Sequence, residues 1–456
     1  MKRSTIALFC SVLIGCGPDD SASRKVVQET SPDGRAFYFM PIIEDGVTDI
    51  TVSVAWPTDW IYTGTDAIAA PYIGAEAILS GGTETLRPQE LLELFNDTNT
   101  GGSINAASDY IYGEVSFPID HVEKVVPIAA EMLANPQFDP AWVARIADGF
   151  AANQREVQNQ QVTQMWNAAR LALLGDDPLN AFLSLPNIDA VADIDRETLQ
   201  AWHAQNLTQD TAVIAVTGAI DAAGAGQVVD TLLGGLPIGP ARPNVQSDAD
   251  FQARTILLHM PDAEKTTIGF VGPLPPTSEG GDLIDLLAVQ TLNGADGPLF
   301  DAIRTELRAS YGLQAGYANF DRRNRVFFIA GEVDTEKLGD VRDVVLETYT
   351  NFRDAPDLSG LDSLKADLAL GTDDNVKYVD VAARTIREFV LDGQDPTIAP
   401  TLGDSLRAIT ADQITARLLS AFPAADRLTV IAASPNQDAF PGACVITAIA
   451  EAANCR

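Results

Sequence analysis

The order of strand-like and helix-like segments occurs twice in this chain, and this repetition limits the folds it can adopt. Each half begins with two segments of strand-like pattern, continues with stretches of helical periodicity and closes with a buried-strand pattern. The Pro- and Gly-rich stretch 234–248 separates the two halves. The 456 residues therefore predict two α/β units of roughly 200 residues each.

The patterns also give the expected elements. The first half is predicted to hold strands at 36–40, 50–56, 110–117 and 211–218, and helices at 66–80, 88–97, 121–134, 140–174 and 221–234. The second half is predicted to hold strands at 254–260, 265–271, 312–319, 325–333 and 427–433, and helices at 281–292, 297–308, 335–353 and 359–370.

The N-terminus has the features of a bacterial secretion signal. Lys2 and Arg3 precede an apolar run at 6–14, which is too short to span a bilayer. The run ends in Leu-Ile-Gly before Cys16, and this pattern resembles the lipobox, in which the signal is cleaved and the cysteine thiol is lipidated. We therefore expect a lipid anchor at Cys16 that holds the protein on a membrane of the bacterial cell envelope. The outer membrane or periplasm is favoured because Gly17, rather than Asp, follows the cysteine.

These features predict the division of the chain into five parts. They are a signal peptide (1–15), a polar tether (16–32), an N-terminal domain (33–235), a linker (236–249) and a C-terminal domain (250–456). Beyond the signal and the lipidated cysteine, only Cys444 and Cys455 remain. In an oxidising envelope this pair is expected to form a disulfide that stabilises the fold by about 3 kcal/mol.

The composition is strongly acidic. Asp and Glu number 63 against 30 Lys and Arg, and the net charge is −33. Such a surface repels nucleic acid, so no nucleic-acid partner is expected. Hydrophobic residues make up 46% of the chain, which is enough for large cores and argues against global disorder.

The segment 71–83 carries the most specific information about function. Its sequence, Pro-Tyr-Ile-Gly-Ala-Glu-Ala-Ile-Leu-Ser-Gly-Gly-Thr, is helical until the final glycines. It resembles the metal-binding helix of the insulinase/pitrilysin-like (inverzincin) zinc peptidases, in which His-x-x-Glu-His is followed by a Gly-Thr pair. Aligning that pair onto residues 82–83 places the first histidine at Ile73, the glutamate at Glu76 and the second histidine at Ala77.

The resemblance extends over nearly the whole mature chain, through weaker matches at 101–106, 135–138 and 175–178. It implies an α/β fold of the α+β sandwich type. Two homologous halves, each a mainly antiparallel sheet with helices packed on it, would form a clamshell.

The side chains that would bind zinc are missing from these positions. Catalytic zinc needs three protein ligands and an open position for water, and Ile73 and Ala77 have no lone pairs to offer. By the resemblance, the third ligand falls near Asn153 or Gln154, or at Glu156 if a short insertion is allowed. One glutamate cannot replace two histidines, so no zinc or other cofactor is expected in this chain. Glu76 stands at the position of the general base, although it can equally be an ordinary solvated carboxylate.

A second motif lies in the other half. Arg304 is followed seven positions later by Tyr311, in a Leu/Ile-Arg-x-x-Leu frame that resembles the family's C-terminal substrate element. The resemblance implies that the arginine binds the substrate backbone and the tyrosine donates to the peptide carbonyl in the transition state. Arg308 is a weaker candidate for the same role. The alternative is that Arg304 is a surface charge and Tyr311 packs in the sheet.

The resemblance therefore favours one function and leaves two alternatives. Some relatives are two-chain peptidases in which one subunit brings zinc and the other brings the Arg/Tyr pair. The first hypothesis is such a non-zinc subunit, paired with a zinc-bearing homologue and acting on peptides or unfolded segments. The second is a catalytically inert peptide-binding or assembly lipoprotein. The third is a hydrolase with an unrelated site, but the sequence contains no nucleophile elbow, phosphate loop or Cys/His dyad that would support it.

The acidic run 372–375 fits a helix cap or turn, or a weak calcium site.

Overall fold

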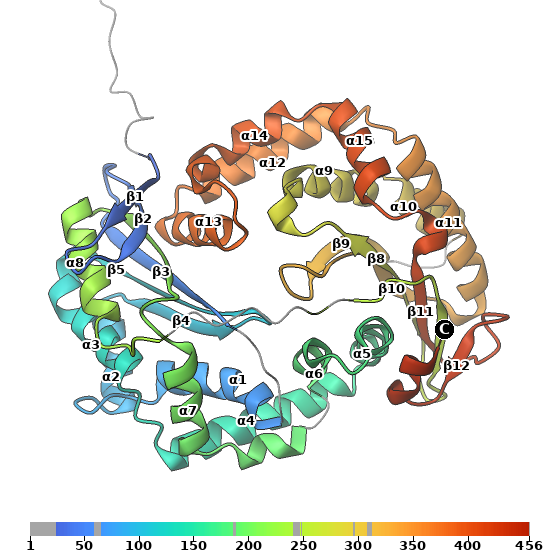
Figure 1. Ribbon diagram of the computed structural model, residues 1–456. Coiled ribbons are helices and arrows are strands. Elements are labelled where there is room, and N and C mark those ends of the chain that lie inside the picture. The colour runs from blue at the N-terminus through green and yellow to red at the C-terminus, as the bar shows by residue number, and fades with distance from the viewer. Residues whose placement is uncertain are drawn as a thin grey trace, which may run out of the picture.

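The computed structural model describes residues 24–58, 65–185, 188–239, 247, 249–294, 297–307 and 312–455. Each half of the chain is built on one six-stranded sheet covered by helices (Figure 1). The first sheet has the order β1-β2-β6-β3-β5-β4, with strands β1 (Val27–Thr30), β2 (Ala36–Pro41), β3 (Asp49–Pro57), β4 (Gly101–Ala106), β5 (Tyr110–Pro118) and β6 (Val213–Gly218). The second has the order β12-β7-β11-β8-β10-β9, with β7 (Thr255–His259), β8 (Thr266–Leu274), β9 (Gln314–Asn319), β10 (Arg325–Val333), β11 (Thr429–Ser434) and β12 (Cys444–Ile446).

The two sheets share one pairing pattern, which confirms the predicted pair of homologous halves. β3 and β5 are antiparallel along their full length, with Asp49 opposite Pro118. β8 and β10 pair in the same way, with Thr266 opposite Val333. On its other side, β3 or β8 pairs antiparallel with β6 or β11. That strand in turn pairs parallel with β2 or β7. The α/β fold with mainly antiparallel sheets is therefore present, and only the strands β1 and β12 at the outer edge differ between the halves.

The helices follow a similar order in the two halves, but in the described residues no α-helix follows β11 as α8 follows β6. The first half holds α1 (Thr65–Ser80), α2 (Pro88–Asp97), α3 (Val122–Ala134), α4 (Pro140–Gln158), α5 (Gln161–Leu174), α6 (Pro178–Ser184), α7 (Arg196–Asn206) and α8 (Ala222–Leu233). The second holds α9 (Asp282–Asn293), α10 (Pro298–Phe300), α11 (Leu338–Asp354), α12 (Leu361–Asn375), α13 (Val379–Leu391), α14 (Leu402–Ala408) and α15 (Ala411–Ala421).

Three predicted segments differ from the structure. The helix predicted at 140–174 is broken after residue 158, and the break lets α5 leave the first half. The helix predicted at 297–308 is the short α10 followed by a π-helix, η5 (Asp301–Glu306). The C-terminal end of the tether expected at 16–32 forms β1, which pairs with β2 and is therefore part of the folded domain. The signal peptide and Cys16 lie outside the described residues.

One helix of the second half covers the first sheet. Along β6 the side chains alternate, so that Ile214 faces the main core of the first half while Ala215 faces the opposite side. On that opposite side α13 packs against β3 and β6 (Figure 1). Ile386 of α13 is buried there with Met40, and the hydroxyl of Thr217 donates to the carbonyl oxygen of Val379 at 2.6 Å.

In the same way, helix α5 of the first half covers the second sheet. This helix packs against β8 and β11 of the second sheet and against the short helix η9 (Ile449–Asn454). Met165 is buried in one cluster with Ile256 and Ile431. The side-chain amide of Gln161 donates to the carbonyl oxygen of Ala433 at 2.7 Å. Each sheet is thus completed by a helix from the other half, so the two halves form one folded body.

Replacing Ile386 with alanine tests this exchange. Ile386 is fully buried between the halves, so Ile386→Ala should lower the free energy of unfolding by about 3 kcal/mol through lost burial and a cavity. Urea unfolding followed by circular dichroism measures the change. The control Leu370→Ala alters a side chain that is 60% exposed and should change it by less than about 0.5 kcal/mol. Equal effects of the two variants would contradict the packing described here.

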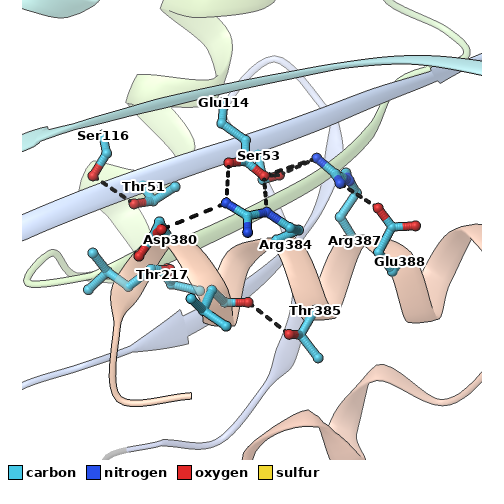
Figure 2. A network of polar contacts seen from close by, with 12 residues as sticks. Thr51, Ser53, Glu114, Ser116, Thr217, Asp380, Arg384, Thr385, Arg387 and Glu388 are labelled. Carbon is cyan, nitrogen blue, oxygen red and sulfur yellow. Dashed lines mark hydrogen bonds and ion pairs between the residues drawn. The ribbon is translucent and has the colours of Figure 1, made fainter. Parts of the chain in front are cut away.

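A partly buried ionic network fixes α13 on the first sheet (Figure 2). Arg384 binds the carboxylate of Glu114 with two hydrogen bonds of 3.0 Å. Arg387, only 1% exposed, donates to Glu114 at 3.2 Å, to the hydroxyl of Ser53 at 2.8 Å and to the neighbouring carboxylate of Glu388. Burial works against the charged form of Glu114, but the hydrogen bonds and charges of the two arginines outweigh it and lower its pKa.

Glu114→Gln should therefore weaken the fold in a pH-dependent way. At neutral pH we expect the free energy of unfolding to fall by about 2 kcal/mol, because charge-assisted hydrogen bonds are replaced by weaker ones. Since the folded pKa of Glu114 is depressed, its contribution is complete above the ordinary value of 4.5 and is lost as the pH falls through the folded pKa. The difference between wild type and variant should shrink in that acidic window. A difference that stays constant from neutral to acid pH, or an equal one for Glu336→Gln on the surface, would refute this role.

Two further contacts join distant parts of the chain. The hairpin turn of the first sheet meets that of the second, where Arg322 donates through Nε to Asp109 at 2.7 Å and through Nη1 to the carbonyl oxygen of Leu391 at 2.9 Å. Cys444 of β12 and Cys455 after η9 form a disulfide. A search of the described residues found no helix with the length and apolar character that a membrane span needs.

Candidate functional site

The site lies in the first half, where a cavity of about 590 Å³ separates α1, α4 and the edge strand β4. Its lining combines apolar and aromatic side chains with a few polar groups. They are Tyr72, Ala75, Glu76, Ser80, Ile104, Asn105, Ala106, Tyr112, Trp142, Arg145, Ile146, Gly149, Phe150 and Asn153. Apolar walls with a small number of polar groups are typical of ligand-binding cavities.

Helix α1 presents different residues to the cavity and to the core. Tyr72, Glu76 and Ser80 follow one another at intervals of four and line the cavity. Ile73 and Ala77 are also four apart, but they belong to the buried core, in one cluster with Val143, Ala147 and Ala151 of α4. The predicted general-base position is therefore open to the cavity, while both positions of the missing histidines are buried among apolar side chains.

The residues present do not fit a zinc ion. Ile73 is fully buried and Ala77 is 1% exposed, and neither has an atom that can bind metal. At the position of the third ligand, Asn153 lines the cavity; Gln154 is half-buried and Glu156 is exposed, and both lie off the lining. In the part of the chain that the structure describes, no group of three or more His, Cys, Asp or Glu side chains is placed to hold a metal ion.

We predict that the purified mature chain binds no stoichiometric zinc. Dialysis against micromolar zinc followed by elemental analysis should give far less than one ion per chain, because the ligand positions are filled by apolar side chains. Ile73→His with Ala77→His should lower stability, since both polar rings would enter the core. Tight binding of one zinc ion by the unaltered chain would show that this reading of the helix is wrong.

An aromatic stack forms one wall of the cavity. The ring of Tyr72 stacks on Phe150 at 5.4 Å and on Phe182 of α6 at 5.1 Å. Burial raises the pKa of the Tyr72 hydroxyl, so it stays protonated and uncharged. Across the cavity, Trp142 donates to the hydroxyl of Ser80 at 3.0 Å and lies beneath the guanidinium of Arg145. The arrangement can hold apolar side chains beside a carboxylate and a cation.

The opposite wall is the edge of a sheet. β4 is the last strand of the first sheet, and its residues 104–106 line the cavity. An edge strand presents unpaired N–H and C=O groups, which can pair with another extended chain. β4 begins with Gly101 and Gly102, and glycine in a strand often marks a place where another backbone approaches closely.

The predicted Arg/Tyr element is described only in part. Arg304 lies in the π-helix η5, and the placement of its side chain is outside the description. Tyr311 and Arg308 lie outside the described residues altogether. Their role in substrate binding therefore stays a prediction.

The acidic run 372–375 is the last turn of α12. Asp373 forms an ion pair with Arg407, and Asp374 forms one with Lys377 at 2.7 Å. These carboxylates are paired within the protein, as expected for a helix end.

Sequence reasoning missed two parts of the site. The aromatic stack has a weak signal, because Tyr72, Glu76 and Ser80 share a helix face, but Phe150 and Phe182 come from helices far along the chain. The network of Arg384 and Arg387 behind β5 had no signal, since α13 itself was not predicted.

Comparisons with known proteins agree with this architecture. Residues 193–368 match the family model of the peptidase M16 inactive domain. No curated protein matches the chain. Among solved structures, a peptidase M16 inactive domain from Pseudomonas fluorescens is 17% identical with a TM-score of 0.79, covering 90% of this chain and 98% of that one.

Two other solved structures are similar. The first half of the periplasmic protease PqqL from Escherichia coli is 14% identical with a TM-score of 0.68, over 94% of this chain and 96% of that one. A point mutant of the ferredoxin protease FusC, in complex with Arabidopsis ferredoxin, is 15% identical with a TM-score of 0.72, over 91% of this chain and 45% of that one. The resemblance to the insulinase-like peptidases is thus confirmed: residues 193–368 match the peptidase M16 inactive domain, and the chain shares the two-halved fold of these structures.

Proposed function

We propose that this protein is the non-zinc subunit of a heteromeric zinc endopeptidase of the bacterial envelope. In this role it binds peptides or unfolded segments and presents them to a zinc-bearing homologous subunit. One observation carries the proposal: the cavity along β4 is open, whereas the zinc positions Ile73 and Ala77 are buried in the core. Binding and hydrolysis are thereby separated, and the chain alone is expected to be inactive.

The cavity suits an extended polypeptide. A peptide that adds a strand to β4 gains main-chain hydrogen bonds, and its alternate side chains point into the cavity. The aromatic wall around Tyr72 offers them apolar surface, and Glu76 and Arg145 can pair with charged ones. This mode of binding recognises the main chain of the peptide more than its side chains, as a subunit that acts on unfolded segments requires.

The Arg/Tyr element would act on the reaction in the partner's site. Arg304 would bind the substrate main chain, and the hydroxyl of Tyr311 would donate to the carbonyl oxygen as negative charge develops there. Donors placed at such a position typically contribute ~3 kcal/mol each.

The proposed location rests on Cys16. A lipid anchor there would hold the complex on the envelope membrane, with the outer membrane favoured. The similarity to PqqL, whose printed description is a periplasmic protease, agrees with a periplasmic site of action. The FusC structure contains ferredoxin bound to a protein of this fold, which agrees with a polypeptide ligand.

The test is to assay the chain alone, its zinc-bearing homologue alone and the mixture on a quenched fluorescent peptide. Only the mixture should be fully active, and Arg304→Ala or Tyr311→Phe should each lower its kcat/KM by about 100-fold. The control Arg427→Ala, which alters an exposed arginine outside the element, should have no effect.

The same assay separates the alternatives. If Arg304→Ala and Tyr311→Phe leave the activity of the mixture intact, the subunit hypothesis fails. If the chain then still binds unfolded polypeptide, the catalytically inert peptide-binding or assembly lipoprotein is the better description.

A further inference from the structure

The duplicated halves differ at their edge strands, β4 and β9, which follow α1 and α9 in the chain. β3 and β8 are equally long and pair identically with β5 and β10, so the two sheets can be compared position by position. Asn293 is the last residue of α9, as Ser80 is the last residue of α1.

Asn293 seals the edge strand of the second half. Its side-chain amide donates to the carbonyl oxygen of Ala315 at 2.7 Å, and its side-chain oxygen accepts from the N–H of Ala315 at 2.7 Å. β9 is the edge of the second sheet, so Asn293 occupies the donor and the acceptor that an added strand would use. A carboxamide can satisfy both groups because it has the same donor and acceptor as a peptide bond.

The corresponding place in the first half lacks this seal. Ala315 lies opposite Ile329, the fifth residue of β10, and Ser103 of β4 lies opposite Glu114, the fifth residue of β5. Ser103 is therefore the counterpart of Ala315. Within the described residues, no side chain of α1 is hydrogen-bonded to it, and the residues that follow it in β4, 104–106, line the cavity.

We infer that Asn293 closes the second half to polypeptide, so that this chain takes up one extended strand, on β4 alone. The inference rests on the proposed function, since it specifies which of two homologous edges binds the peptide. It also assigns the closure of β9 to a single side chain, the carboxamide of Asn293.

The test uses hydrogen exchange of the full chain, read by mass spectrometry over β4 and β9. The probe is reduced and carbamidomethylated ribonuclease, a basic unfolded polypeptide that the acidic chain does not repel. In the wild-type protein the probe should slow exchange in β4 and leave β9 unchanged. In Asn293→Ala, exchange at Ala315 should rise about tenfold through the lost hydrogen bond, and the probe should now slow exchange in both strands.

Two further variants test whether the carboxamide of Asn293 itself closes β9. Asn293→Asp preserves the shape and can still accept from the N–H of Ala315, but it cannot donate to the carbonyl oxygen, so it should also raise exchange in β9. Gln290→Ala removes an exposed carboxamide from the same helix and should behave as wild type. Circular dichroism identifies any variant that has unfolded.

The outcomes distinguish this inference from the proposed function. Slowed exchange in β9 of the wild-type protein, or no change in β9 of Asn293→Ala and Asn293→Asp, would overturn the inference while leaving binding at β4 intact. If the probe slows neither strand in any variant, the proposed function fails, and the inference fails with it.

Discussion

The exchange of α5 and α13 between the halves is the contact on which the rest of this structure depends. Each sheet has a main core on one face, and the opposite face is covered by a helix from the other half. Arg387 and Glu114 make the exchange polar as well as apolar, and an unpaired charge at this depth would be costly. The chain therefore behaves as one body, and its two edge strands, β4 and β9, are held in a fixed relation.

That rigid frame explains how the site has lost metal chemistry without losing its shape. Ile73 and Ala77 are buried in the apolar core of the first half, which also contains residues of α4. Glu76 and Tyr72 line the cavity, whose other walls come from β4 and α4. The absence of metal ligands and the presence of the cavity are compatible, because Ile73 and Ala77 are buried while Tyr72, Glu76 and Ser80 line the cavity.

The sequence predicted those features that depend on local pattern. The strand alternation gave β3, β5, β8 and β10 close to their observed bounds. Their order suggested the duplication, and the family resemblance was needed to sharpen it. The sequence could not show that residues 140–174 break into two helices, because the break serves a contact with the other half. α13 was missed for the same reason, and β1 was assigned to the tether because four residues of weak alternation carry little signal. Asn293 belongs to no sequence motif, and its role appears only when the edge strands β4 and β9 are compared.

We propose that the first half binds polypeptide without a metal ion. Calorimetric titration of an unfolded polypeptide into the mature chain, with and without a strong chelator, tests it most directly. The account predicts the same affinity in both titrations, because the cavity is shaped by protein side chains alone. Binding that disappears with the chelator and returns on adding zinc would contradict it.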